Sequence, residues 1–82
     1  MMEYIATFYS HFGAIRFKRL CEAAGLRAAV MPVPRNLSSS CGTCVKFQAR
    51  GEDDFPEKNE EMEQIVLITE TGFRQVYLAE DV

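Results

Sequence analysis

The sequence has no tryptophan, one histidine and only three cysteines among its 82 residues. No apolar run approaches the roughly 20 residues that a membrane-spanning helix needs, so we expect no membrane segment. Residues 1–4 do not lead from a basic stretch into a long apolar run, so we expect no signal peptide. A chain of this length can hold one small domain, over residues 1–82, but no deep substrate cavity closed on all sides.

The three cysteines cannot all pair within one chain, and a small secreted domain is expected to carry an even set. The odd count therefore favours a cytoplasmic protein over a secreted disulfide scaffold. The hydrophobic fraction of 48% and the charged fraction of 26% are ordinary for a globular protein, which excludes a disordered chain.

Charge is distributed unevenly along the chain, although the net value is only −3. Residues 1–51 hold seven basic and two acidic side chains, whereas residues 52–63 hold seven acidic side chains and Lys58. The basic residues are not clustered with exposed aromatic ones, and the acidic segment would repel phosphate groups, so we expect no nucleic-acid partner. The acidic segment is most simply a solvated loop and helix start, with docking of a basic partner as the alternative.

The N-terminal segment predicts a strand followed by a helix. Residues 4–9 are rich in aromatic and β-branched side chains and too short for an ordinary helix, so we expect a strand buried on both faces. Ser10 is a candidate N-cap, and Gly25 is the expected C-terminal stop of the helix. Apolar residues at spacings of three and four form its buried stripe, namely Ala14, Phe17, Leu20, Cys21 and Ala24.

Two further strands are expected in the first 51 residues. Residues 26–33 are largely apolar, and Pro32 and Pro34 indicate that this strand ends there or lies at an edge of the sheet. Residues 45–49 alternate between apolar and polar side chains and predict a third strand, closed by Gly51.

The segment from residue 56 onward is open to two interpretations. β-branched residues on both sides of a short turn that contains Gly72 fit a β-hairpin. The alternative is a helix that starts at Pro56 and is capped by Gly72. Its stripe would be Met62, Ile65, Val66 and Thr69. We favour this second helix, over residues 56–70, followed by a fourth strand over residues 73–79.

The expected order is strand, helix, strand, strand, helix, strand. It predicts an α+β fold of the ferredoxin-like βαββαβ type, a four-stranded antiparallel sheet with two helices on one face. In that topology the Arg35–Cys44 loop, the helix start at Ser10 and His11, and the close of the second helix near Gly72 share one edge of the sheet. We expect the chemistry there.

The loop that ends at Cys44 is the most informative stretch. Gly42 permits a backbone conformation in which consecutive amide N–H groups point at one spot, and three serine hydroxyls could donate to the same place. With Arg35 nearby, such a loop would favour an anionic sulfur at Cys41. The expected anion-stabilising residues are Arg35, Ser38, Ser39, Ser40 and Gly42.

Cys44 follows Cys41 at the CxxC spacing, which has several meanings. A thioredoxin-type dithiol places its first cysteine at the start of a long helix, whereas here serines precede the pair and a short strand follows. A zinc site within one chain needs four ligands, and Cys21 and His11 would have to leave other roles to complete it, so we expect no metal. An incidental pair in a serine-rich turn is the remaining alternative.

The string Met-Pro-Val-Pro-Arg-Asn-Leu-Ser-Ser-Ser-Cys-Gly occupies residues 31–42, and residues 4–8 and the Ala24-Gly25 pair add a weaker pattern. In these stretches the chain resembles a family of small selenium/sulfur carrier-like domains. The resemblance implies a ferredoxin-like fold and the transient carriage of sulfur or selenium on Cys41, without another cofactor.

The resemblance also implies protein partners. A cysteine desulfurase-like donor would pass sulfur or selenium to the Cys41 thiolate, and an acceptor protein would receive it. Cys44 and the acidic stretch at 52–61 depart from the family pattern. This departure leaves open whether Cys44 attacks Cys41, releases sulfide or selenide and leaves a disulfide. His11 is a candidate for proton transfer. We expect a monomer or a weak homodimer.

Two other function classes stay open. A small thioredoxin-like dithiol oxidoreductase would need both Cys41 and Cys44, whereas a non-catalytic adaptor would need neither.

Overall fold

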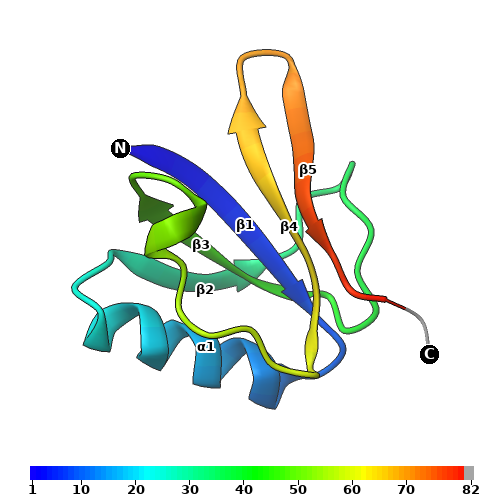
Figure 1. Cartoon of the computed structure of the whole chain (residues 1–82). Helices are drawn as coiled ribbons and strands as arrows, with labels where there is room; N and C mark the ends of the chain where they lie inside the picture. The colour runs from blue at the N-terminus through cyan, green and yellow to red at the C-terminus, as the bar shows by residue number, and fades with distance from the viewer. Residues whose placement is uncertain (81–82) are drawn as a thin grey trace.

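The computed structural model describes residues 1–80, which form a five-stranded antiparallel sheet, one α-helix and one 3-10 turn (Figure 1). The strand order across the sheet is β2-β3-β1-β4-β5. The elements are β1 (Met2–Phe8), α1 (His11–Ala23), β2 (Ala28–Pro32), β3 (Thr43–Ala49), η1 (Glu52–Asp54), β4 (Met62–Thr69) and β5 (Gly72–Leu78). The α+β class is thus confirmed, and within residues 1–80 no helix is long and apolar enough to cross a membrane.

Both ends of α1 follow the local chemistry of the sequence. The Gly13 N–H donates to the Ser10 hydroxyl at 3.2 Å, which makes Ser10 the N-cap. After the last turn, Gly25 adopts a φ of 79°, and the Leu26 N–H donates to the Cys21 carbonyl at 2.8 Å. This glycine-based stop is the Schellman arrangement, so the predicted start and end of the helix are confirmed.

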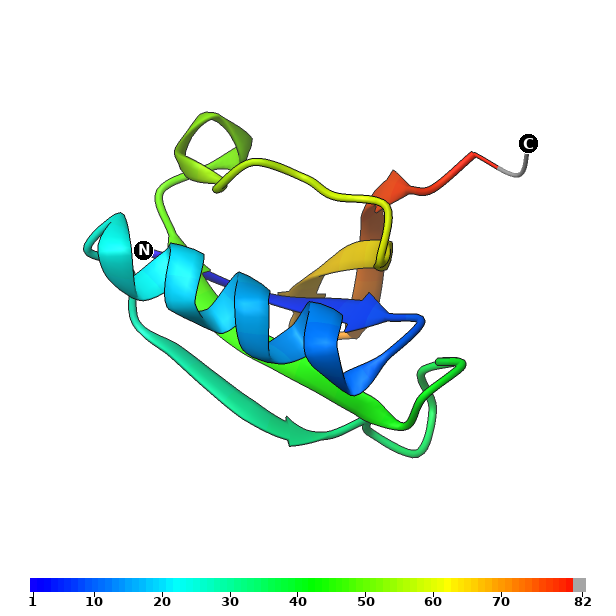
Figure 2. The ribbon, with the colours of Figure 1, turned by 90° about the horizontal axis from the view of Figure 1, so that it is seen from below.

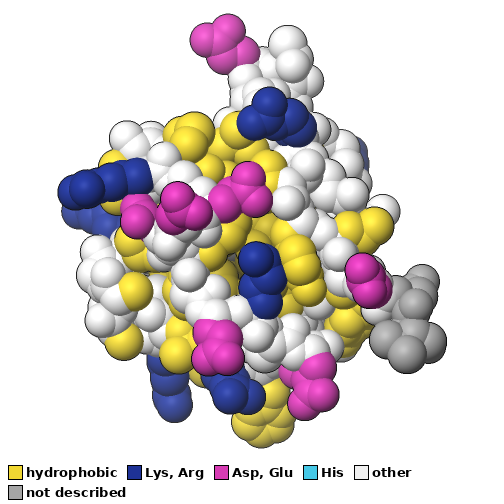
Figure 3. Space-filling model, in the orientation of Figure 1, with side chains coloured by type: hydrophobic (Ala, Val, Ile, Leu, Met, Phe, Trp, Pro, Cys, Tyr) yellow, Lys and Arg dark blue, Asp and Glu magenta, His cyan; other side chains and the backbone are white. Residues whose placement is uncertain are grey.

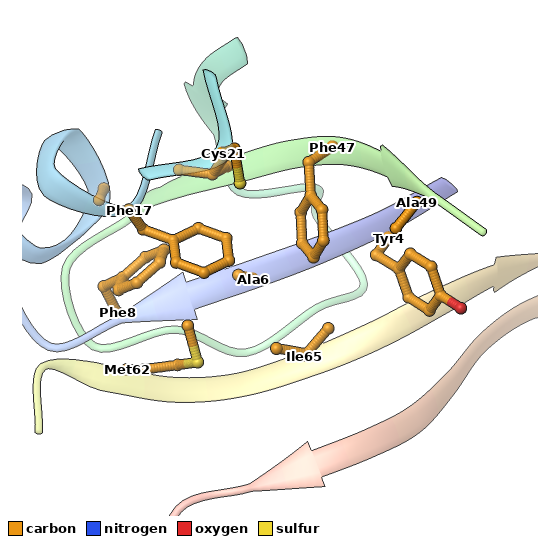
Figure 4. Close-up of a cluster of buried hydrophobic side chains, with 11 residues drawn as sticks. Tyr4, Ala6, Phe8, Phe17, Cys21, Phe47, Ala49, Met62 and Ile65 are labelled. Atoms are coloured by element: carbon orange, nitrogen blue, oxygen red, sulfur yellow. The ribbon is translucent and has the colours of Figure 1, made fainter. Parts of the chain in front are cut away.

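β1 lies in the middle of the sheet and is buried on both faces, as predicted. Its alternating side chains contribute to two apolar clusters. The helix-side cluster, shown in Figure 4, contains Tyr4, Ala6, Phe8, Ala14, Phe17, Cys21, Val45, Phe47, Ala49, Met62 and Ile65. The outer cluster, on the opposite face, contains Ile5, Cys44 and Val66, with Met31, Val33, Leu37, Ile68 and Phe73 packed against it. The two clusters fix the positions of the strands that carry the site.

The second helix that we predicted over residues 56–70 is wrong. This part of the chain holds β4, which pairs with β1 on one side and with β5 on the other, so the hairpin interpretation is the one that the structure adopts. An interior strand is buried on both faces, and neighbouring residues such as Ile65 and Val66 enter opposite clusters. Two adjacent buried apolar residues fit the buried stripe of a helix as well as they fit an interior strand, and this led to the wrong prediction. The two-helix, four-stranded ferredoxin-like arrangement is therefore replaced by a fold with one helix and an added hairpin.

The acidic segment takes the place of the missing helix. Residues 50–61 run over the same side of the sheet as α1 (Figure 2). The Phe55 ring from this segment meets the rings of Tyr4 and Phe47 edge-on, with centroid distances of 4.7 and 5.3 Å. One aromatic side chain thus anchors a segment whose acidic residues between 52 and 60 remain exposed.

Gly13 marks the close approach between α1 and this segment. A Cβ at this position would lie 2.6 Å from the Glu61 Cβ and 3.2 Å from Cδ2 of Phe8. We expect Gly13→Ala to lower the free energy of unfolding by about 1–3 kcal/mol, because this overlap outweighs the roughly 1 kcal/mol gained in helix propensity. Urea denaturation measures the difference.

Gly51→Ala is the matched control for this substitution, since a Cβ there meets no atom of residues 1–80 within 4 Å and the backbone is extended. It should change stability by less than about 0.5 kcal/mol. Equal stability of Gly13→Ala and the wild type would contradict the close packing of α1 on residue 61.

Candidate functional site

The serine loop, residues 33–42, connects the edge strand β2 to β3 (Figure 1). A hydrogen bond joins its two ends, because the Val33 N–H donates to the Gly42 carbonyl at 3.1 Å. Gly42 has a φ of 74°, a backbone conformation that favours glycine. Val33 and Leu37 pack against the outer cluster. The loop therefore covers the sheet face opposite α1 and is fixed by apolar contacts as well as by its ends.

Cys41 is a half-buried free thiol at the end of this loop. Its Sγ donates to the Thr43 carbonyl at 3.4 Å, and its side chain packs against the helix-side cluster. Of the three cysteines it is the one that solvent reaches, because Cys21 and Cys44 are both fully buried.

Cys44 lies in β3 and faces the other side of the sheet, within the outer cluster. Its Sγ is 3.7 Å from the Pro32 carbonyl oxygen, to which the thiol donates. Burial, and to a smaller extent the neighbouring Cys41, raises the pKa of the Cys44 thiol to about 11. In this conformation Cys44 is thus protonated at neutral pH and covered, and a step that uses it as a nucleophile requires the serine loop to lift.

Two of the serines in the loop bind β4. The Ser40 hydroxyl and N–H both donate to the Glu63 carboxylate, the N–H at 3.2 Å, and the Ser38 carbonyl accepts from Nε2 of Gln64 at 3.1 Å. The Ser39 hydroxyl is buried and has no hydrogen-bond partner among residues 1–80. The donors of Ser40, which we expected to face a sulfur anion, are therefore occupied by a carboxylate of the same chain.

His11 lies in the first turn of α1 and reaches the loop. Its Nδ1 is 2.7 Å from the Thr43 hydroxyl, and the Thr43 carbonyl accepts from the Cys41 thiol. The start of α1 and the end of the serine loop thus share one edge of the sheet, as predicted. Arg35 is exposed and makes no ion pair within residues 1–80.

Gly72, which we expected at this edge as the end of a second helix, does not lie there. Gly72 is the first residue of β5, directly after the turn from β4, whereas the end of β4 that reaches the site is Met62, paired with Phe8. Our placement of Gly72 was wrong because it rested on a helix running in from residue 56. The turn is at the far end of the hairpin from the site.

Three residues at the site escaped the sequence interpretation: Thr43, Glu63 and Gln64. Glu63 was counted with the solvated acidic run, although it is the second residue of β4 and holds Ser40. The signal that could have found it is the hairpin interpretation, in which residue 63 leaves the acidic run and enters the strand beside β1.

Cys21 belongs to the packing of α1, in agreement with its place in the predicted stripe. Burial, with a smaller contribution from Glu22, raises the pKa of its thiol to about 12. Within residues 1–80, no three His, Cys, Asp or Glu side chains come together in a group that could hold a metal ion.

The buried thiols predict a loss of stability at alkaline pH. Thiols of the unfolded chain ionise near pH ~8.5, whereas in the fold Cys44 and Cys21 keep their protons to about pH 11 and 12. Between these values the unfolded state binds fewer protons, so the free energy of unfolding should be constant below pH ~8.5 and fall as pH rises above it.

The measurement is the slope of stability against pH between 8.5 and 11, from urea denaturation under reducing conditions. Cys44→Ala should show a shallower slope than the wild type, because it removes one of the two thiols. Tyr4, whose pKa is also raised chiefly by burial, is present in both proteins and cancels in the comparison. Equal slopes would show that Cys44 is not protected in the folded state.

Comparison with known proteins adds a family. The sequence family described as "Putative Se/S carrier protein-like" matches residues 3–77. The chain is also similar to "Uncharacterized protein YtiA" of Escherichia coli (strain K12), with 36% identity over 45 residues. That match covers 55% of this chain and 53% of the relative, so the chain spans about half the length of the curated relative that it matches. No solved structure matches significantly.

Proposed function

Because the chain belongs to the Se/S carrier-like family, we propose that it carries sulfur or selenium on Cys41 between a donor protein and an acceptor protein. The observation that carries the proposal is the contrast among the three cysteines. Cys41 is accessible at the end of a loop, whereas Cys21 and Cys44 are fully buried. A carrier needs one accessible sulfur and a surface for its partners, and a chain of 82 residues can supply both.

Loading is a sulfur transfer between two cysteines. The Cys41 thiolate attacks the outer sulfur of a persulfide on a cysteine desulfurase-like donor, and an S–S bond forms at Cys41. The S–S bond of the donor breaks, and its electron pair leaves with the donor cysteine as a thiolate. The oxidation state of the transferred atom does not change, so the step needs no further oxidant or reductant. Selenium would follow the same path.

Proton removal from Cys41 has a candidate path in the first turn of α1. The thiol donates to the carbonyl of Thr43, and the hydroxyl of the same residue contacts His11 at 2.7 Å. A neutral imidazole near this edge would accept the proton released as the thiolate forms. His11→Ala should then slow loading, and the rate at which labelled sulfur appears on Cys41 measures the effect.

Discharge has two candidate routes. A thiolate of the acceptor attacks the outer sulfur of the Cys41 persulfide, and Cys41 leaves as a thiolate. Alternatively, the Cys44 thiolate attacks Sγ of Cys41, hydrosulfide leaves with the electron pair of the broken bond, and a Cys41–Cys44 disulfide remains. The burial of Cys44 supports the first route for the conformation described here, because its thiol is covered by the serine loop.

The test is incubation of the protein with a cysteine desulfurase and isotopically labelled cysteine, followed by mass spectrometry under non-reducing conditions. We expect the added mass of one labelled sulfur on the peptide that contains Cys41. With a selenium donor the added mass is that of selenium. Absence of any added mass on the wild-type protein would overturn the proposed function.

A further inference from the structure

Phe12 is an aromatic side chain in an unusual position. It is 84% exposed, although it lies in the second position of α1 and the helix has a fully apolar buried face. An isolated, solvated phenylalanine contributes nothing to the fold and loses the free energy that burial would give it. Figure 3 shows hydrophobic atoms projecting from the lower edge of the molecule, where α1 begins in Figure 1.

The residues around Phe12 extend it into a surface, which we call the α1 face: Phe12, Ile15, Arg16, Arg19 and Val30. The other three helical members follow Phe12 by three, four and seven residues and so share one stripe with it, and all four are exposed. Ile15 and Arg19 from α1 and Val30 from the edge strand β2 line opposite sides of a shallow groove with a volume of about 590 Å³. Lys18 and Glu22, which also line it, form an ion pair with each other. The α1 face is therefore apolar at its centre and basic along one side.

This face borders the site. His11, directly before Phe12, contacts the Thr43 side chain, and the Thr43 carbonyl accepts from the Cys41 thiol. A protein that covers the exposed aromatic ring would reach the loop end that carries the thiol. Of the acidic segment, Glu61 lies against Gly13 in the first turn of α1, whereas residues 52–54 follow β3 at the other end of the sheet. Arg16 and Arg19 on the stripe are exposed.

We propose that the α1 face docks the protein that delivers sulfur or selenium to Cys41, and that this partner presents an apolar pocket rimmed by carboxylates. The inference rests on the proposed function, because it places the donor beside the loaded thiol. The Phe12 ring is the anchor that fills the pocket, as aromatic residues do at the centres of interfaces. Arg16 and Arg19 meet the carboxylates and speed the encounter.

The experiment compares two ways of loading Cys41. One uses a purified cysteine desulfurase with labelled cysteine, and the other uses inorganic polysulfide, which needs no docking. Phe12→Ala, and separately the double variant Arg16→Glu and Arg19→Glu, should lower the desulfurase-driven rate by about tenfold or more. Loading by polysulfide should stay within about twofold of the wild type, because neither variant touches the loop. Added salt should slow only the desulfurase reaction.

Two matched controls lie at the other end of the sheet. Met2→Ala removes a partly exposed apolar side chain beside the end of β3, and Arg50→Glu reverses an exposed charge there. Both should load at the wild-type rate from either source. The exposure of Phe12 keeps its substitution from unfolding the chain, and circular dichroism checks this.

The outcomes separate the docking proposal from the proposed function. Equal desulfurase-driven rates for the wild type and both α1-face variants would overturn the docking surface while leaving the carrier function intact. No loading of the wild type by polysulfide or by the desulfurase would overturn the carrier function and the docking surface with it. If sedimentation shows that the wild type self-associates and Phe12→Ala does not, a second copy of this chain occupies the face and the donor proposal is wrong.

Discussion

Replacing Cys41 with serine should abolish loading by a sulfur or selenium donor, whereas Cys44→Ser should load at a rate within about twofold of the wild type. The difference follows from the positions of the two thiols, because Cys41 is the accessible one and Cys44 is buried on the other face of the sheet with a raised pKa. Thiolate is the attacking species, so the fraction ionised at neutral pH decides the rate. Mass spectrometry of the desulfurase reaction over time measures the loading rate of each variant.

The same pair of variants separates the three function classes. A dithiol oxidoreductase would reduce insulin disulfides catalytically and would lose that activity in either variant. An adaptor would behave like the wild type in both variants and in every partner assay. Equal loading of Cys41→Ser and the wild type would remove Cys41 from the mechanism. A loss of loading in Cys44→Ser as complete as in Cys41→Ser would show that loading requires both thiols and would contradict a carrier mechanism on Cys41 alone.

The elements of the first half of the chain could be predicted because local chemistry determines them. Ser10 caps α1 whatever packs around it, and Gly25 ends the helix by its positive φ. β1 was also evident, since a short run of aromatic and β-branched residues has no other stable conformation. These signals depend on residues within one turn or one strand of each other.

β4 could not be predicted with the same security, because its pattern depends on neighbours that are distant in the sequence. Ile65 and Val66 are both buried only because β1 and β5 lie on either side and both sheet faces are covered. Without that knowledge two adjacent apolar residues fit a helix as well as a strand. The ferredoxin-like expectation then reinforced the error, since that arrangement calls for a helix at this point.

The meeting of the loop end with the start of α1 could be predicted from the sequence, but the hydrogen bonds of the candidate site could not. The serine-rich string directed attention to Cys41, and the helix topology brought His11 to the same edge. What the string could not reveal is that Glu63 binds Ser40, because this contact joins residues 23 positions apart through the register of β4. Likewise, alternation along β3 sends Cys44 to the outer cluster, so the CxxC spacing does not place both thiols on one surface.

Replacing Phe47 with alanine should lower the free energy of unfolding by about 3–5 kcal/mol. Phe47 is almost completely buried in β3 and is the ring on which three others converge, with centroid distances of 5.5 Å to Tyr4, 5.2 Å to Phe17 and 5.3 Å to Phe55. The substitution opens a cavity between α1, the central strand and the acidic segment at once. The total free energy of unfolding of a small domain is about 5–15 kcal/mol, so the variant should be partly unfolded at 37 °C.

Phe12→Ala is the matched control, because it deletes the same atoms from a side chain that is 84% exposed. Its unfolding free energy should stay within about 0.5 kcal/mol of the wild type. Urea denaturation followed by circular dichroism measures both variants. A loss below about 1 kcal/mol for Phe47→Ala would mean that the acidic segment and α1 do not share one packed core. The same pair of phenylalanines then distinguishes the two roles of aromatic residues in this chain, since one should be required for the fold and the other for delivery of sulfur to Cys41.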